Sequence, residues 1–358
     1  MREVCTPLTE RYIAVDNVCA WPNLTRMPDG AIISTIFSQP CHGLWEGDVE
    51  CWTSLDEGRT WSYRGTAAPH EPNTNRMNVA AGLAANGDLI VLASGWDDRP
   101  TIASGPGEEQ EWQPAGVGRS NVLHPWVCRS ADGGRTWKRD GVVEFSPRAE
   151  GYLEPVPFGD IVACGDGTLG VSVYTRKLDG ALSSFFLSSR DDGQTWGECV
   201  PLAPMHNETT LFSFGDGRLL AAARSRNLDQ FVSNDAGRTW ELHGPLTGAG
   251  ELPGHFLRLT DGRILLTYGI RHSGFYGVGA RIGDPDGTTW YTPIVLVNLD
   301  DTHDGGYPSS VQSPDGTVVT AYYSRGVQAH TRYHMGVVRW DIDRAVEKNR
   351  VPENWPSP

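Results

Sequence analysis

The sequence predicts an all-β protein, a six-bladed β-propeller of four-stranded antiparallel blades. Three observations support this fold class. An eight-residue pattern of the form Ser-x-Asp-x-Gly-x-Thr-Trp recurs along the chain. A two-residue Asp-Gly or Asn-Gly turn followed by an apolar strand occurs six times. No helical period of useful length is found before residue 342.

The eight-residue pattern, here called the Ser-Asp-Gly turn, is expected to be a folding device. Full copies lie at 54–61, 130–137, 189–196 and 233–240, and a degenerate copy lies at 283–290. The aspartate of such a turn can accept backbone N–H bonds, and the glycine supplies a positive φ. The closing tryptophan can pack against the blade. Because the copies occupy equivalent places, a role in folding is favoured over calcium binding or catalysis.

The six short hairpins define six repeat units. Their glycines are Gly30, Gly87, Gly167, Gly217, Gly262 and Gly316. In the first five units another strand, a Ser-Asp-Gly turn and a last strand follow the hairpin, but the sixth unit lacks the turn. The strand-like segment 11–17 is free to complete the sixth blade. We therefore expect a single propeller domain over 1–358, with blades at about 19–342 and one short helix in the tail 343–358.

The bulk composition excludes several classes of partner. The chain has 358 residues and a net charge of −14, which argues against a nucleic-acid surface. No apolar run is long enough for a membrane span, and the N-terminus lacks the apolar core of a signal peptide, so a cytoplasmic location is expected. The seven cysteines have no metal-ligand spacing and are expected to be free, mostly buried thiols. No metal or cofactor is expected, and nothing indicates the oligomeric state.

The order of the strands predicts which face carries a site. The short hairpins and the Ser-Asp-Gly turns both lie on one face, so the opposite face has the central funnel. Nine residues after each hairpin glycine stand Gln39, Trp96, Arg176, Arg226, Arg271 and Arg325. Arg224 shares a side-chain face with Arg226, because strand residues alternate. Guanidinium groups bind carboxylates in bidentate fashion, so the funnel is expected to take an anionic ligand.

Further polar residues are expected on the funnel face. They lie at the starts of innermost strands and in the second loop of the first blade: Asp160, His206, Glu208, His303, Asp304 and Tyr307, with His42, Glu46 and Asp48 in the loop. Acid, phenol, imidazole and guanidinium groups that converge in this way are typical of an active site.

The Ser-Asp-Gly turn is similar to the Asp-box, and residues 19 to 340 resemble the sialidase superfamily of six-bladed propellers. The segment "GGYPSSV" resembles that of the family's tyrosine nucleophile, which implies Tyr307, and "NETT" implies Glu208 as its base. The resemblance also implies Arg224 and Arg271 as carboxylate ligands, and Asp48 or Glu46 as proton donor. The family's first carboxylate-binding arginine is replaced by Ala20, unless Arg11, Arg26 or Arg325 takes its place.

Three functions remain open, each with a glycan or oligosaccharide as ligand. The first is a sialidase-like exo-glycosidase acting on sialic acid or a related anionic sugar. In it, the Tyr307 hydroxyl would be exposed to the funnel and within hydrogen-bond reach of Glu208. The second is a hydrolase or lyase of uronic-acid glycans, in which Tyr307 and His303 or His206 would move the proton. The third is a glycan-binding propeller without catalysis.

Overall fold

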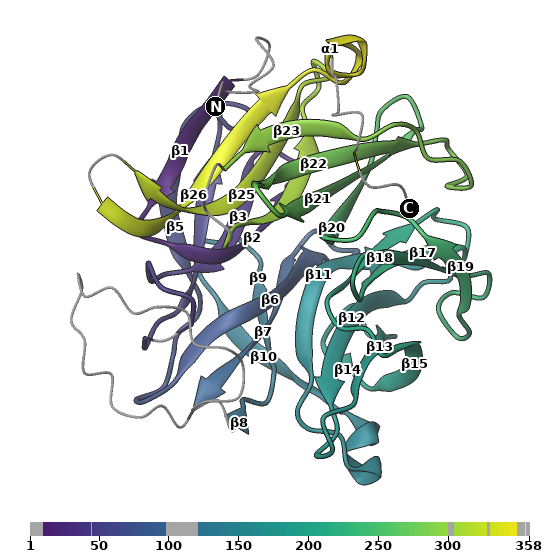
Figure 1. The fold of residues 1–358 in the computed structure, drawn as a ribbon. Coiled ribbons are helices and arrows are strands. Elements are labelled where there is room, and N and C mark those ends of the chain that lie inside the picture. The colour runs from purple at the N-terminus through teal and green to yellow at the C-terminus, as the bar shows by residue number, and fades with distance from the viewer. Residues whose placement is uncertain are drawn as a thin grey trace.

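The computed structural model describes residues 10–43, 45–97, 121–299, 304–327, 330–348 and 355. The fold is all-β, with sheets in a propeller-like arrangement (Figure 1). Helix is confined to the short 3-10 helix Ser146–Glu150 and to α1 (Ile342–Lys348), so the short helix expected in the tail is confirmed within the described residues. Across the described chain, no helix has the length and apolar character needed to cross a membrane.

Four of the sheets are separate, four-stranded and antiparallel, as the repeats predict. The first contains β2 (Cys19–Arg26), β3 (Ile32–Phe37), β4 (Val49–Ser54) and β5 (Ser62–Ala68). The next contains β16 (Thr209–Ser213), β17 (Leu219–Arg224), β18 (Leu228–Ser233) and β19 (Glu241–Pro245). It is followed by β20 (Glu251–Arg258), β21 (Ile264–His272), β22 (Phe275–Gly283) and β23 (Ile294–Asn298). The last contains β24 (Gly306–Gln312), β25 (Val318–Val327), β26 (His330–Trp340) and β1 (Glu10–Asp16).

The two ends of the chain meet in the last sheet, as the free N-terminal segment predicts. Strand β1 pairs antiparallel with β26, from Glu10 opposite Arg339 to Asp16 opposite His334. The purple and yellow strands lie side by side in Figure 1. The guanidinium of Arg339 also binds the carboxylate of Glu10.

The remaining strands form one sheet of ten strands. One run contains β6 (Asn75–Leu83), β7 (Leu89–Asp97), β8 (Asn121–Val122), β9 (Trp126–Ser130) and β10 (Lys138–Val143). The other contains β11 (Val156–Ala163), β12 (Leu169–Arg176), β13 (Leu182–Ser189) and β15 (Glu198–Pro204), with β14 (Thr195–Trp196) beside β10. The runs join at two places, where β6 pairs in parallel with β11 and where β10 pairs in parallel with β14, each at two positions. Gly82 permits the approach of β6 to β11, since a Cβ there would lie 2.5 Å from the carbonyl oxygen of Ile161.

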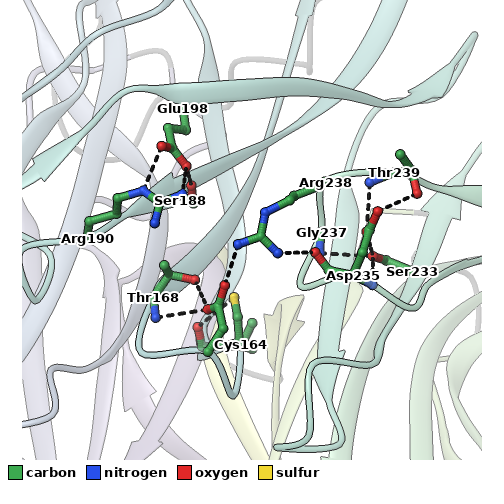
Figure 2. A network of polar contacts seen from close by, with 12 residues as sticks. Cys164, Thr168, Ser188, Arg190, Glu198, Ser233, Asp235, Gly237, Arg238 and Thr239 are labelled. Carbon is green, nitrogen blue, oxygen red and sulfur yellow. Dashed lines mark hydrogen bonds and ion pairs between the residues drawn. The ribbon is translucent and has the colours of Figure 1, made fainter.

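The Ser-Asp-Gly turns have the geometry expected of a folding device. In the copy shown in Figure 2, Asp235 accepts the backbone N–H of Thr239 at 2.9 Å and its hydroxyl at 2.7 Å. The Trp240 indole donates to the carbonyl of Gly237 at 3.0 Å, and Gly237 has a φ of +87°. The other three full copies have the same aspartate–threonine and tryptophan–glycine bonds.

The same turn also ties neighbouring sheets together. Arg238 donates to the carbonyl of Asp235 at 2.7 Å (Figure 2). It also donates to the carboxylate of Asp166, in the hairpin of the preceding repeat, at 2.8 Å. A Cβ at Gly237 would lie 2.4 Å from the ring of Phe186, so only glycine lets the turn settle on that ring. The six described cysteines are free thiols, and five of them are buried, as expected.

Candidate active site

The centre of the site is a hydrogen bond between a phenol and a carboxylate. Tyr307, the second residue of β24, donates from its hydroxyl to Oε1 of Glu208 at 2.8 Å. Glu208 directly precedes β16, so both groups stand at the start of an innermost strand, and the predicted proximity is confirmed. Tyr307 is 6% exposed and Glu208 is 5% exposed. The structure therefore corrects the expectation that the hydroxyl is exposed to the funnel.

Arg224 holds both members of this pair. It ends β17, which is hydrogen-bonded to β16, and so it lies beside Glu208. Its Nη1 forms an ion pair with the Glu208 carboxylate and donates to the Tyr307 hydroxyl at 2.7 Å. A buried carboxylate is costly unless it is paired and hydrogen-bonded, and the guanidinium supplies both interactions.

The surroundings keep the phenol of Tyr307 protonated. Burial raises its pKa most; the positive charge of Arg224 opposes this, while the negative charge of Glu208 raises it further. A neutral phenol is a weak nucleophile and needs a base to remove its proton. The Glu208 carboxylate is the group placed to do so.

Aromatic side chains cover the ring of Tyr307. Trp21 stacks on it with ring centroids 5.1 Å apart and planes at 30°. Phe158 meets it edge-on at 6.2 Å, and Tyr323 lies tilted at 5.6 Å. This wall explains why the hydroxyl is buried.

The predicted ring of arginines is only partly present at Tyr307. Arg271 in β21 joins Arg224, with its Cζ 5.4 Å from the centre of the Tyr307 ring. Arg325 contacts the ring of Tyr333 instead of the ring of Tyr307, with its Cζ 5.9 Å from the centre of the Tyr333 ring. Arg176 and Arg226 are exposed and lie outside this group. Strand β17 ends at Arg224, so the alternation that would turn Arg226 inward has already stopped.

Two other arginines considered as substitutes for the missing one are engaged elsewhere. Arg11 donates to the Tyr322 hydroxyl at 2.8 Å and to the carbonyl of Asn298. Arg26 forms an ion pair with Glu57 at 2.9 Å.

Asp304 is the centre of a second, partly buried acidic group beside the first. Its Oδ1 accepts the Tyr323 hydroxyl at 2.5 Å, and its Oδ2 accepts the Tyr333 hydroxyl. His42 Nδ1 lies 3.3 Å from the same Oδ2. Burial alone would raise the pKa of Asp304, but the hydrogen bonds from His42 and the two phenols bring it well below its usual range. The carboxylate is therefore ionised at neutral pH.

The two acids expected as proton donor lie in a separate group around His70. Asp48 Oδ1 accepts the His70 backbone N–H at 2.7 Å and lies 2.6 Å from its ring Nδ1. Glu46 accepts the backbone N–H of Asn73, and its Oε2 is 3.8 Å from His70 Nε2. The structure thus directs both acids toward the loop that precedes β6.

Most of the remaining predicted residues also have partners of their own. Asp160 lies 3.0 Å from His255 Nε2 and accepts the Asn23 amide at 3.0 Å. His206 lies 2.9 Å from Asp229 instead of joining Tyr307. The indole of Trp96 packs at the edge of the aromatic cluster around Tyr307. His303 lies outside the described residues.

Four aromatic residues of the site were not predicted. Trp21, Phe158, Tyr323 and Tyr333 contact Tyr307, Asp304 or His42. Two of them leave a signal in the sequence. Tyr323 precedes Arg325 by two positions and so shares its side of β25, and Tyr333 is paired with Arg325 across the sheet. Trp21 has no periodic neighbour that would mark it.

Comparison with known proteins agrees with this architecture. The family described as BNR repeat-like domain matches residues 101–320. The chain is 24% identical over 247 residues to a sialidase of Clostridium perfringens, a match that covers 63% of this chain and 61% of that protein. It is 28% identical over 278 residues to a sialidase of Micromonospora viridifaciens, covering 68% of this chain and 39% of that protein. The chain thus spans less than two thirds of either relative.

Solved structures show the same fold at low identity. A protein of unknown function from Dyadobacter fermentans superimposes with a TM-score of 0.72 at 22% identity, covering 95% of this chain and 99% of that one. Trypanosoma rangeli sialidase in complex with the inhibitor DANA superimposes with a TM-score of 0.68 at 15% identity, covering 91% and 55%.

Proposed function

Because the chain belongs to the BNR repeat-like domain family of sialidase-like propellers, we propose that it is a retaining exo-glycosidase. Its substrate would be a glycan that ends in an anionic sugar, sialic acid or a related acid. The observation that carries the proposal is the buried triad in which Arg224 holds both the Tyr307 hydroxyl and the Glu208 carboxylate.

The triad fits the first step of a double-displacement reaction. The Tyr307 oxygen attacks the anomeric carbon while its proton passes to Glu208, 2.8 Å away. The glycosidic C–O bond breaks, and the leaving oxygen takes a proton from a third group. Water then attacks the same carbon, and the phenolate departs with the proton that Glu208 holds. Two inversions give net retention.

The charges around Tyr307 fit an anionic sugar. A substrate carboxylate next to the anomeric carbon would repel an anionic nucleophile, whereas the neutral phenol of Tyr307 avoids this repulsion. Arg224 and Arg271 both lie over the Tyr307 ring, at 6.0 and 5.4 Å, where they can bind that carboxylate.

We further propose that the ring contains six blades in one domain over about 19–342. The ten-stranded sheet contains two antiparallel runs that resemble the other blades in strand order. Two residue pairs join their innermost strands, Gly159 with Ala80 and Asp160 with Ala81, and two further pairs join β10 to the two-residue strand β14. On this interpretation, the two runs are neighbouring blades whose innermost strands come close enough to pair.

A panel of fluorogenic glycosides tests the function. Sialosides and glucuronides are compared, and each product is identified. A reducing sugar supports hydrolysis, an unsaturated uronate absorbing in the ultraviolet would show a lyase, and binding without turnover would show a lectin-like role. A fluorinated sugar of the accepted type should leave a covalent adduct on Tyr307, detected by peptide mass. Hydrolysis with the label on another residue would overturn the assignment of the nucleophile.

A further inference from the structure

The loop between β3 and β4 brings a histidine, rather than a carboxylic acid, next to the Tyr307 group. Resting on the proposed function, we propose that His42 is the general acid and base of the reaction, and that Asp304 positions its ring. In a retaining glycosidase one group protonates the leaving oxygen and later takes a proton from water. Three observations support this assignment: the position of His42, its contact with Asp304, and the positions of Asp48 and Glu46, the acids that it would replace.

His42 contacts two of the rings that also contact Tyr307. Its imidazole meets Trp21 edge-on at 5.5 Å and Tyr323 edge-on at 6.1 Å. Those rings lie 5.1 and 5.6 Å from the ring of Tyr307. One layer of side chains therefore separates His42 from Tyr307, so the two groups lie in the same aromatic cluster.

Asp304 orients the imidazole. The His42 nitrogen that faces it is Nδ1, 3.3 Å from Oδ2, so Nε2 lies on the far side of the ring. The carboxylate is itself fixed, because the phenols of Tyr323 and Tyr333 each donate to one of its oxygens. A carboxylate that faces Nδ1 holds the imidazole in one orientation.

The acids of the same loop are less well placed. Asp48 and Glu46 are turned toward His70 and the backbone of Asn73, which use their oxygens. Among His42, Glu46 and Asp48, only His42 contacts the rings of Trp21 and Tyr323 that surround Tyr307.

The proton balance of the reaction can be written for this pair. In the first step the His42 imidazolium gives its Nε2 proton to the leaving oxygen as the glycosidic C–O bond breaks, and the Nδ1 proton stays on the Asp304 side. In the second step neutral Nε2 takes a proton from the attacking water. The imidazolium is restored, and Glu208 returns its proton to the phenolate of Tyr307.

Leaving-group dependence tests the proposal. For His42→Ala and the less disruptive His42→Gln, kcat/KM for a glycoside with an alkyl-alcohol leaving group should fall about 100-fold or more. For a glycoside with an activated phenol as leaving group, the fall should stay under about 10-fold, since such a phenol needs little protonation. Asp304→Asn should show the same selective loss to a smaller degree, which a merely structural change would not produce. His124→Ala, which removes a histidine paired with Glu154 elsewhere, is the matched control.

The outcomes separate this proposal from the proposed function. If the wild type hydrolyses the glycosides but the His42 variants lose both substrates equally, or Asp48→Asn shows the selective loss instead, His42 is not the acid. If the wild type hydrolyses none of the panel, the glycosidase function fails and the role of His42 fails with it. A thermal melt of each variant identifies any general loss caused by unfolding, and His42→Gln then decides the question.

Discussion

The two faces of the propeller satisfy their carboxylates in opposite ways. On the face with the Ser-Asp-Gly turns, the aspartate of each full copy is bound by groups within four residues of it, as Asp235 is by Ser233 and Thr239. On the other face, Glu208 is bound by Tyr307, 99 positions away, and Asp304 faces His42, 262 positions away. Local bonds can form as the turn forms, whereas the distant ones exist only once the ring has closed.

This difference separates folding devices from chemistry. In a repeated turn, neighbouring residues supply the hydrogen bonds of the aspartate. Such a turn stabilises each blade and leaves no polar group free to bind a ligand. A buried carboxylate is weak evidence for stability, because desolvation offsets much of the attraction to its partner. Where several such groups converge at one end of the sheets, a functional reason is the better explanation. Substitutions on the two faces should therefore affect different quantities.

The largest effect is expected on the face of the turns. The indole of Trp196 is fully buried and donates to the carbonyl of Gly193 at 3.2 Å. Trp196→Ala should lower the free energy of unfolding by about 3–5 kcal/mol, measured by denaturant titration. Activity per folded molecule should be unchanged. Trp137→Ala, at a partly exposed position of the same motif, should cost less. Intact stability with lost turnover would show that the faces were assigned wrongly.

Tyr307→Phe should produce the converse result. The phenylalanine keeps the ring that stacks on Trp21 but removes the hydroxyl shared by Glu208 and Arg224. Turnover should fall by at least about 100-fold, as it does when a nucleophile is removed. The melting temperature should change by only a few degrees, because Arg224 still pairs with Glu208. Comparable turnover in the variant would remove Tyr307 from the chemistry.

Arg271→Ala probes the charge of the ligand and should have a smaller effect. Loss of one charged hydrogen-bond pair weakens binding by about 1.5–3 kcal/mol. The kcat/KM for an anionic glycoside should fall accordingly, by about 10- to 100-fold. A neutral glycoside of the same leaving group is the control and should be affected far less. Equal losses for both substrates would mean that Arg271 supports the ring of Tyr307 instead of binding a carboxylate.

The parts that could be predicted from the sequence are those set by local or periodic rules. Hairpin glycines and Ser-Asp-Gly turns depend on a few adjacent residues, so the repeats and the closing strand β1 followed from the pattern. Tyr307 and Glu208 could be paired because strand order places both at the start of an innermost strand.

What could not be predicted depends on loops and strand ends. Asp48 and Glu46 lie in a loop without a side-chain period, so nothing in the sequence indicated that they bind around His70. The prediction that Arg226 faces the funnel was wrong because β17 ends two residues earlier than the repeat register implies. The pairing of His42 with Asp304 required a contact between the first and last repeats, which no local pattern encodes.

The smallest effect concerns one of the local carboxylates and its dependence on pH. Although burial raises the pKa of Asp56, hydrogen bonds from Thr60, Ser54 and Arg59 lower it to about 2. An aspartate in the unfolded chain has a pKa of about 3.9, so its stabilisation is complete above that value and is lost as the pH falls through about 2. Asp56→Asn should therefore cost about 1 kcal/mol at pH 7, and the gap should close near pH 2.

Thermal melts of the wild type and Asp56→Asn at pH 7, 5, 3 and 2 would measure this gap, with the exposed Glu241→Gln as control. A gap that stays constant over this range would mean that the turn depends on the shape of the side chain and not on its charge. The turns would then not need an ionised aspartate, whereas the funnel face holds charged carboxylates. The contrast between the two faces would become sharper.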